Sequence, residues 1–368
     1  MTELAERALL PAGLRDILPP FAAFEADTVS RLMAVFARHG YDRVKPPMIE
    51  FAQNLDGDGA FRVMDPLTQR MMTVRSDMTP QVARIAATRL TSDPRPLRLA
   101  YAGQVLQVKG TQLRAERQFG QVGVELIGAT DSAADAEILA LCLDAVDHVG
   151  LSGIAVDLTL SKLVPAIIGE QNGETWLRNA LDHRDVTAVS AAGGETARLL
   201  TALIEAVGPA DRALARLQSL DLPAPAQALR SRLVEVVALL RAALPGLTLT
   251  IDPVETRNFE YHTGVGFTIF ARESAAEIGR GGRYLAHGEP AVGATLFMDT
   301  LMEILPRPAP PRRLYVPAGG DRKSAGSFRD SGWVTINGLA AADDVAAEAR
   351  RLRCTHVLHN GEPVALGD

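Results

Sequence analysis

Alternation between apolar and polar residues recurs in five separate stretches of this chain, and it constrains the fold more than any other feature. An alternating stretch places its apolar side chains on one face of a β-strand. The five stretches are residues 97–108, 119–127, 154–160, 247–251 and 265–269. Most of them follow one another with helical segments around them, which favours an antiparallel α+β sheet over a doubly wound parallel one.

Helical patterns flank the alternating stretches. Apolar residues recur at helical spacing in residues 21–39, between two prolines and Gly40, and predict a long amphipathic helix. A second helix is predicted over about residues 131–149. Residues 161–244 are rich in Ala, Leu and Arg and carry an apolar stripe that includes Leu233 and Leu240, so we interpret them as a helical insertion.

Proline and turn signals organise the segments between residues 40 and 80. Residues 41–47 contain Pro46-Pro47 and predict an edge strand, which invites a partner subunit. Residues 61–74 predict a hairpin around an Asp-Pro turn. The Thr79-Pro80 pair that follows is typical of a helix start.

Changes of composition divide the chain. A proline-rich stretch, PRPAPP, follows Leu305 and predicts a stiff linker, and the residues beyond it read strand, strand, helix, strand. We therefore expect two parts of one core at residues 1–160 and 247–305, the helical insertion at 161–246, the linker at 306–311 and a small α/β domain at 312–368.

Composition excludes several classes of protein. With 368 residues, 47% of them hydrophobic, the chain can bury at least one full core. Its 38 basic and 44 acidic residues give a formal charge of −6, so no chain-wide basic excess favours nucleic acid. Two cysteines without a CxxC motif indicate neither a disulfide framework nor a thiolate metal site. No signal-peptide or membrane-span pattern is evident, and we expect a cytoplasmic protein.

The most specific candidate site lies on the alternating stretch at residues 117–127. Gln121, Gly123 and Glu125 share one face of this strand, and apolar side chains occupy the other. An amide and a carboxylate on either side of a glycine would suit a small polar cation such as an amino acid. A solvent-exposed sheet face is the alternative, and this strand alone does not choose between the two.

Three other segments carry polar side chains in short groups. Arg75, Asp77 and Thr79 combine one cation with two groups that accept from an ammonium, although Thr79 could equally be a helix N-cap. Residues 257–264 cluster polar and aromatic groups before a turn, or form a hairpin with a satisfied histidine. Residues 279–284 are glycine-rich and basic but lack the Walker spacing, so they are weak evidence for a phosphate site.

Taken together and in order, these segments resemble the catalytic domain of histidyl-tRNA synthetase, a class II aminoacyl-tRNA synthetase fold, over about residues 8–305. The resemblance covers the family's opening, its dimer-forming motif 1, the segment and strand around motif 2, the histidine-specific motif and the approach to motif 3. The matching segments are residues 11–16, 40–47, 74–79, 117–125, 257–264, 281–284 and 290–293. It implies an antiparallel sheet flanked by helices.

The chain departs from this family where the family grips ATP. Residues 106–109 read Leu-Gln-Val-Lys where the family has Phe-Arg-x-Glu, Ala115 replaces a further arginine, and residues 297–300 read Phe-Met-Asp-Thr in place of Gly-Leu-Glu-Arg. Desolvated charge-assisted contacts contribute roughly 2 to 5 kcal/mol each, and about 1.4 kcal/mol is tenfold in rate. We therefore expect no aminoacylation and no catalytic residues, and we assign neither a metal nor a cofactor.

The amino-acid side of the family's site is better preserved. The resemblance implies that Asp77, Thr79 and Gln121 accept or orient the α-amino group of histidine and that Arg257 binds its carboxylate. It likewise implies that Glu125, together with His262 and Tyr284, contacts the imidazole. His262 stands in place of a family tyrosine and Asp77 in place of a glutamate.

A chain of this kind that lacks both the ATP contacts and an anticodon-binding domain resembles the regulatory subunit of ATP phosphoribosyltransferase. Only 57 residues follow the linker, too few for the anticodon-binding domain, so we expect no tRNA binding. The resemblance implies a dimer within a hetero-octamer with a short-form catalytic subunit. It also implies that the subunit is required for activity and for feedback inhibition by histidine at the first step of histidine biosynthesis.

Two alternatives remain open at this point. The chain could be a divergent histidyl-tRNA synthetase-like ligase that contacts ATP in another way, in which case it would catalyse histidine-dependent exchange of pyrophosphate into ATP. It could instead be an amino-acid-responsive regulator of another target, in which case tRNA affinity at physiological salt would be measurable.

Overall fold

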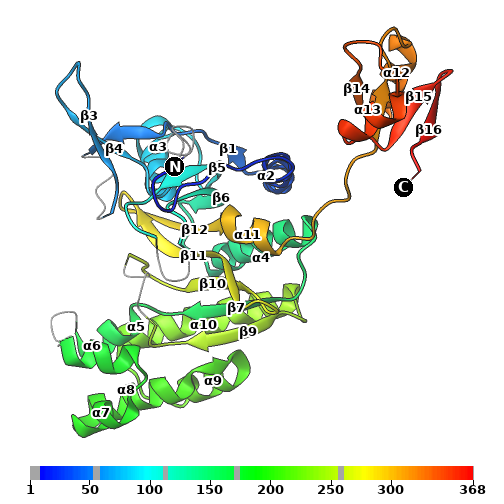
Figure 1. Ribbon diagram of the computed structural model, residues 1–368. Helices are drawn as coiled ribbons and strands as arrows, with labels where there is room; N and C mark the ends of the chain where they lie inside the picture. Colours follow the sequence, from blue (N-terminus) through cyan, green and yellow to red (C-terminus); the bar gives the residue numbers. More distant parts are fainter. Residues whose placement is uncertain (1–8, 53–58, 111–114, 170–174, 256–260, 368) are drawn as a thin grey trace. The chain divides into compact units, whose positions relative to one another are not determined.

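A computed structural model describes residues 9–52, 59–110, 115–169, 175–255 and 261–367 of the chain (Figure 1). Contacts between Cα atoms divide the chain into two compact units, with the boundary between Pro306 and Arg307. The finer division of the larger unit into core and insertion stays a prediction. Among the described residues, no helix is both long and apolar enough to cross a lipid bilayer.

The larger unit contains a nine-stranded sheet. In spatial order its strands are β1 (Asp42–Arg43), β5 (Leu97–Leu106), β6 (Gln118–Ile127), β12 (Glu289–Phe297), β11 (Ala276–Ala286), β10 (Gly266–Ala271), β7 (Ile154–Thr159), β9 (Thr248–Asp252) and β8 (Gly208–Pro209). Neighbouring strands are antiparallel except in the pairs β1–β5 and β7–β9. The five alternating stretches form β5, β6, β7, β9 and β10, which confirms the predicted antiparallel α+β sheet.

Helices cover the sheet because their apolar stripes match its apolar face. The long amphipathic helix predicted at residues 21–39 is α2 (Phe21–Arg38), and the one predicted at 131–149 is α4 (Ser132–His148). Both pack against the same face of β6, where Val122, Val124 and Leu126 point into the core. Two further helices, α3 (Thr79–Arg89) and α11 (Met298–Ile304), lie near the cavity described below.

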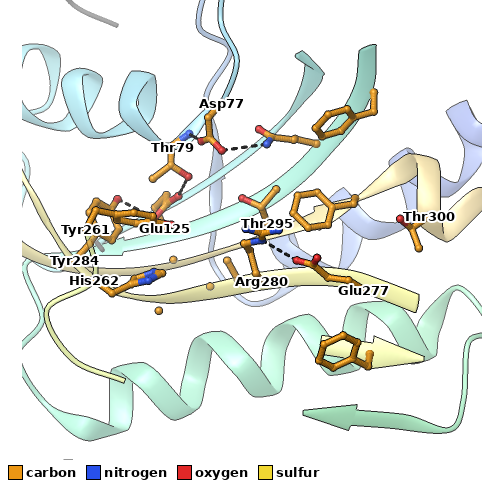
Figure 2. A pocket seen from close by; sticks show the side chains of 18 of the residues that line it. Asp77, Thr79, Glu125, Tyr261, His262, Glu277, Arg280, Tyr284, Thr295 and Thr300 are labelled. Atoms are coloured by element: carbon orange, nitrogen blue, oxygen red, sulfur yellow. Dashed lines mark hydrogen bonds and ion pairs between the residues drawn. The ribbon is translucent and has the colours of Figure 1, made fainter. Parts of the chain in front are cut away.

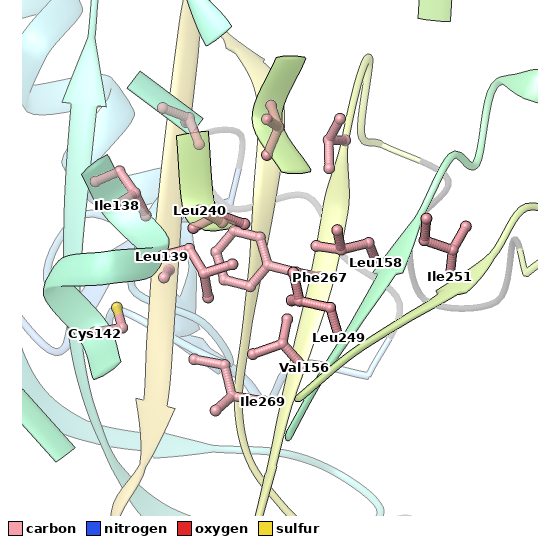
Figure 3. Close-up of a cluster of buried hydrophobic side chains, with 14 of the residues drawn as sticks. Ile138, Leu139, Cys142, Val156, Leu158, Leu240, Leu249, Ile251, Phe267 and Ile269 are labelled. Atoms are coloured by element: carbon pink, nitrogen blue, oxygen red, sulfur yellow. The ribbon is translucent and has the colours of Figure 1, made fainter. Parts of the chain in front are cut away.

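The connection between the parallel strands β7 and β9 is helical, as its composition predicts (Figure 1). The described helices of this segment are α5 (Leu163–Ile168), α6 (Thr175–Asp182), α7 (Val186–Ala191), α8 (Gly194–Ala206), α9 (Ala210–Gln218) and α10 (Ala224–Ala243). Leu240 of α10 meets Phe267 of β10 and the apolar side of α4 in one buried cluster (Figure 3). The insertion therefore shares the core of the sheet.

A three-stranded sheet lies beside the start of α3. Its strands, in spatial order, are β2 (Ile49–Phe51), β4 (Met71–Val74) and β3 (Arg62–Met64). The hairpin predicted at residues 61–74 is the β3–β4 pair. The edge strand predicted at residues 41–47 is limited to β1, which lies at the end of the nine-stranded sheet.

The interpretation of Thr79 as an N-cap is wrong. Met78 occupies the cap position of α3 without a side-chain cap bond, and Thr79 is already helical. Asp77 supplies the missing acceptor, because its Oδ1 accepts a 2.7 Å hydrogen bond from the Thr79 amide. The Thr79 hydroxyl is therefore left to point toward the sheet.

Two long strands, β11 and β12, have no counterpart among the sequence predictions. Gly279, Gly281, Gly282 and Gly293 interrupt their alternation, and glycine is depleted in ordinary strands. A Cβ at each of these positions would meet a neighbouring backbone or side chain at less than 3 Å. The glycines therefore mark close approaches within the sheet.

The smaller unit is an α/β sheet with two helices. Its strands, in spatial order, are β14 (Val334–Asn337), β13 (Arg313–Val316), β15 (His356–His359) and β16 (Glu362–Ala365), and its helices are α12 (Arg322–Asp330) and α13 (Val345–Arg351). The sequence predictions included neither α12 nor β16. Residues 319–321 hold the N-cap of α12. Asp321 accepts hydrogen bonds there from the amides of Lys323 and Ser324.

Candidate functional site

A cavity of about 740 Å³ lies on the face of the central sheet that α2 and α4 leave uncovered (Figure 2). Its floor comes from β6, β12 and β11, and the beginning of α3 and residues 261–262 border it. A cavity of this size accommodates a small molecule. The side chains that line it form two groups, one centred on Glu125 and one on Arg280.

Glu125 is fully buried at the centre of the first group. The Thr79 hydroxyl donates to its Oε1 at 2.8 Å, and the Tyr284 hydroxyl donates to its Oε2 at 2.9 Å. Tyr101 approaches Oε1 at 3.4 Å and also bonds Thr295 at 2.7 Å. Burial raises the pKa of the Glu125 carboxyl to about 8, so the group is mainly neutral at pH 7.

Glycines make room for this carboxyl. Gly293 of β12 lies directly opposite Glu125 of β6, and a Cβ there would occupy the space of the carboxylate. Gly123 of β6 lies under the Tyr101 ring, and a Cβ there would collide with the phenol. Any larger residue at these two positions would displace the buried hydrogen-bond network.

Asp77 and Gln121 form a second polar pair beside Glu125. The Gln121 amide donates to Oδ2 of Asp77 at 3.1 Å, and its own oxygen accepts from the Met78 amide at 3.0 Å. Both Asp77 oxygens therefore hold one hydrogen bond each, and each retains a lone pair for a further donor. An ammonium group is a donor of this kind.

His262 closes one side of the first group. The residue is 1% exposed, and its ring lies 4.1 Å from the Tyr261 ring, centroid to centroid, at an interplanar angle of 34°. Burial, with a smaller contribution from the charge of Arg280, lowers the pKa of the imidazole to about 3. His262 is therefore neutral, and it presents an uncharged polar surface to the cavity.

The second group surrounds Arg280 of β11. Its Nε donates to Oε1 of Glu277 at 2.7 Å, and its guanidinium carbon lies 5.5 Å from the centre of the Phe297 ring. Gln107 and Thr300 also line the cavity. Of the lining residues that the structure describes, Arg280 is the only lysine or arginine.

Six of the seven predicted site residues meet in this one cavity. They are Asp77, Thr79, Gln121, Glu125, His262 and Tyr284. The seventh, Arg257, lies outside the described residues. Their role in binding histidine stays a prediction. The alternative of a solvent-exposed sheet face is wrong, because Gln121 is 2% exposed and Glu125 is fully buried.

Arg75 does not belong to the site. Its Nε donates to the carbonyl of Gln104 at 2.7 Å, and its Nη1 donates to the carbonyl of Pro46 at 3.2 Å. The residue is buried, and its guanidinium joins the segment before β2 to β5. Arg75 therefore has a structural role, and it does not contact the cavity.

Sequence reasoning left four side chains out of the predicted site, namely Tyr101, Glu277, Arg280 and Thr295, although Arg280 lies in the segment 279–284 noted as weak evidence for a phosphate site. Tyr101 lies on β5, which was predicted. It pairs there with Gly123 of β6, and this small neighbour could have drawn attention to it. The other three lie on β11 and β12, which were not predicted. Within the described parts of the chain, no group of three His, Cys, Asp or Glu side chains could hold a metal ion.

The larger unit matches a known family along almost its whole length. A family profile described as Histidyl-tRNA synthetase matches residues 13–301. A crystal structure titled as an ATP phosphoribosyltransferase regulatory subunit/histidyl-tRNA synthetase from Bacillus halodurans shares the fold with a TM-score of 0.81 at 23% identity, covering 93% of this chain and 96% of that one. The ATP phosphoribosyl transferase (HisG:HisZ) complex from Thermotoga maritima gives a TM-score of 0.60 at 19% identity, covering 74% and 97%.

Sequence comparison gives a closer match. The ATP phosphoribosyltransferase regulatory subunit of Paramagnetospirillum magneticum is 61% identical over 97% of this chain and 98% of its own length. The regulatory subunit of Rhodospirillum centenum is 55% identical, covering 96% of this chain and 95% of its own. With a histidyl-tRNA synthetase-like fold and this identity over nearly its full length, the chain belongs to the family of ATP phosphoribosyltransferase regulatory subunits.

Proposed function

We propose that this chain is a non-catalytic regulatory subunit of ATP phosphoribosyltransferase. It joins a short-form catalytic subunit, is required for that subunit's activity, and carries feedback inhibition by histidine at the first step of histidine biosynthesis. The names of its relatives support the regulatory role, and the complex from Thermotoga maritima supports a catalytic partner.

The observation that carries this proposal is the charge distribution of the cavity. Enzymes that act on nucleoside triphosphates place Lys, Arg or Mg²⁺ against the phosphates. Here Gln107, Thr300 and the carboxylates of Glu277 and Glu303 line the cavity together with Arg280. Two acidic side chains and a single described cation make a poor triphosphate site, so the proposal assigns the chain no adenylation chemistry.

The other part of the cavity fits an amino acid better than a nucleotide. Asp77 and Gln121 present oxygen acceptors suited to an α-ammonium group. The neutral carboxyl of Glu125 can both donate and accept, and an imidazole has one nitrogen of each kind. These groups support histidine as the ligand of this cavity.

Feedback by histidine also requires a partner that senses occupation of the cavity. A ligand shifts an equilibrium only by its unequal affinity for two states, and the effect on the partner's substrates is reciprocal. The proposal therefore includes assembly of this chain with the catalytic subunit, as a dimer within a cytoplasmic hetero-octamer. It does not include binding of tRNA. The position of β1 at the end of the nine-stranded sheet supports self-association through that edge.

Reconstitution tests the proposal. A short-form catalytic subunit is assayed for phosphoribosyl-ATP formation alone, with this chain, and with this chain plus histidine. We expect little activity alone, a marked increase on addition of the chain, and inhibition by histidine. Equal activity with and without the chain would contradict the proposal.

Two variants locate the histidine response. Glu125→Ala removes the carboxyl at the centre of the cavity, so it should raise the histidine concentration needed for half inhibition. Glu289→Ala is a matched control, because Glu289 pairs with Arg95 on the same sheet but does not line the cavity. An unchanged response in Glu125→Ala would place the effector elsewhere.

A further inference from the structure

Arg280 is the one lysine or arginine among the described residues that line the cavity, and the proposed function gives it no role. It lies on β11, with Thr295 of β12 and Thr268 of β10 opposite it in the sheet. Figure 2 shows its guanidinium between the group around Glu125 and the more distant Thr300. The side chain is 28% exposed, so it can reach a ligand that enters the cavity.

The sheet register relates the position of this cation to that of the buried carboxyl. Glu125 projects over Gly293 of β12, whereas the Arg280 guanidinium lies near the Phe297 ring of the same strand. Arg280 pairs with Thr295, two residues from Gly293, and both Arg280 and Glu125 line the same cavity, so one small ligand can contact both groups.

The ammonium site lies on the neighbouring strand. Gln121 of β6 is directly opposite Phe297, and it holds Asp77 at the cavity wall. Asp77 therefore offers an acceptor for an α-ammonium group beside Glu125, and the Arg280 guanidinium lines the same cavity near the Phe297 ring. The neutral carboxyl of Glu125 is left to contact the side chain of the amino acid.

On this geometry, and resting on the proposed function, we propose that Arg280 binds the α-carboxylate of the amino-acid ligand. Before the ligand binds, the Glu277 carboxylate forms an ion pair with the Arg280 guanidinium. The ligand's carboxylate replaces the Glu277 carboxylate at a site already built for one. Arg280 keeps an anionic partner throughout, so the exchange leaves no uncompensated guanidinium in the cavity. Binding therefore selects ligands with a free carboxylate.

Isothermal titration calorimetry of the full-length chain with histidine and with histidinol tests this role. Histidinol carries an alcohol in place of the carboxylate and keeps the ammonium and the imidazole. In the unmodified chain histidine should bind more tightly than histidinol. Arg280→Gln should weaken the affinity for histidine by about 10- to 100-fold, the range for loss of a charged hydrogen-bond partner. The affinity for histidinol should change by no more than about 2-fold.

Two further variants sharpen the result. Glu277→Gln removes the competing carboxylate, so histidine should bind more tightly than in the unmodified chain while histidinol does not change. Arg257→Ala tests the other arginine to which the carboxylate was assigned from sequence, and the proposal expects it to lack the carboxylate-selective loss. Arg280→Lys keeps the charge without the planar fork and should recover part of the histidine affinity.

The outcomes separate this inference from the function on which it rests. No histidine binding to the unmodified chain would overturn both. Histidine binding that Arg280→Gln weakens to the same extent as histidinol would overturn the role of Arg280 and leave the histidine site intact. A carboxylate-selective loss in Arg257→Ala but not in Arg280→Gln would do the same and would return the carboxylate to Arg257.

Discussion

The buried carboxyl of Glu125 makes the stability of this protein depend on pH in a direction that can be measured. Burial raises its pKa from the ordinary 4.5 to about 8 in the folded chain. Between these two pH values the unfolded chain has released the proton, whereas the folded chain still holds it. The unfolded state then binds fewer protons, so the free energy of unfolding falls as pH rises.

The size of the effect follows from the two pKa values. One pH unit corresponds to about 1.4 kcal/mol, so the loss of stability is about 3 kcal/mol at pH 7 and about 5 kcal/mol above pH 8. Below pH 4.5 both states are protonated and this loss is absent. Glu125→Gln has nearly the same shape, can still accept from Thr79, and does not titrate.

Urea unfolding followed by far-UV circular dichroism measures the effect at pH 5.5, 6.5, 7.5 and 8.5. The free energy of unfolding of Glu125→Gln minus that of the unmodified chain should increase by about 3 kcal/mol between pH 5.5 and 7.5. Glu289→Gln, outside the cavity, reports the effect of replacing a glutamate elsewhere on the sheet. If the difference in free energy of unfolding between Glu125→Gln and the unmodified chain stays constant with pH, the Glu125 carboxyl is not protonated in the folded chain over this range.

Three other substitutions test the packing around the site and in the smaller unit. Gly293→Ala places a methyl group against the buried carboxylate and should lower the free energy of unfolding by about 1 to 3 kcal/mol; an unchanged urea midpoint would contradict the close approach. Asp135→Ala removes the carboxylate that pairs with buried Arg283 and should lower the free energy of unfolding by about 3 to 5 kcal/mol. The control Asp211→Ala removes an exposed carboxylate and should lower it by less than about 0.5 kcal/mol. Equal losses would show that burial of the pair is unimportant. Asp321→Ala should destabilise α12 and accelerate amide hydrogen exchange there, and unchanged exchange in α12 would argue against the cap.

The sequence predicted the strand that carries the site, because local alternation decides it. Gln121, Gly123 and Glu125 lie on one face of β6 as their spacing required. Alternation did not show that this face is buried. That burial comes from Thr79 and Tyr284, which lie far away in the chain and meet Glu125 only in the folded sheet.

The strands β11 and β12 escaped prediction for a related reason. Glycine at positions such as 281 and 293 weakens the local strand pattern, yet the folded sheet requires it there because neighbouring atoms fill the space of a Cβ. Arg280 was consequently read as part of a weak phosphate loop. Its value as the one described cation in the cavity appears only when β11 pairs with β12.

The same limit applies to the support behind the site. Arg283, next to Tyr284 on β11, donates to both carboxylate oxygens of Asp135 on α4, and Arg232 of α10 bonds the same carboxylate at 2.8 Å. In the sequence, Asp135 lies 97 residues from Arg232 and 148 residues from Arg283. No periodicity within one segment reports a contact between segments so distant, although this contact joins the insertion to the strand of the cavity.

Loss of nucleotide chemistry, with the amino-acid site retained, is tested most directly by pyrophosphate exchange. The purified chain is incubated with histidine, ATP, Mg²⁺ and labelled pyrophosphate, and label in ATP is counted. We expect no label above the level without protein, because Gln107 and Thr300 provide no charge for the phosphates. Histidine-dependent incorporation of label would show that the chain forms an adenylate, and it would contradict the assignment of a non-catalytic regulatory subunit.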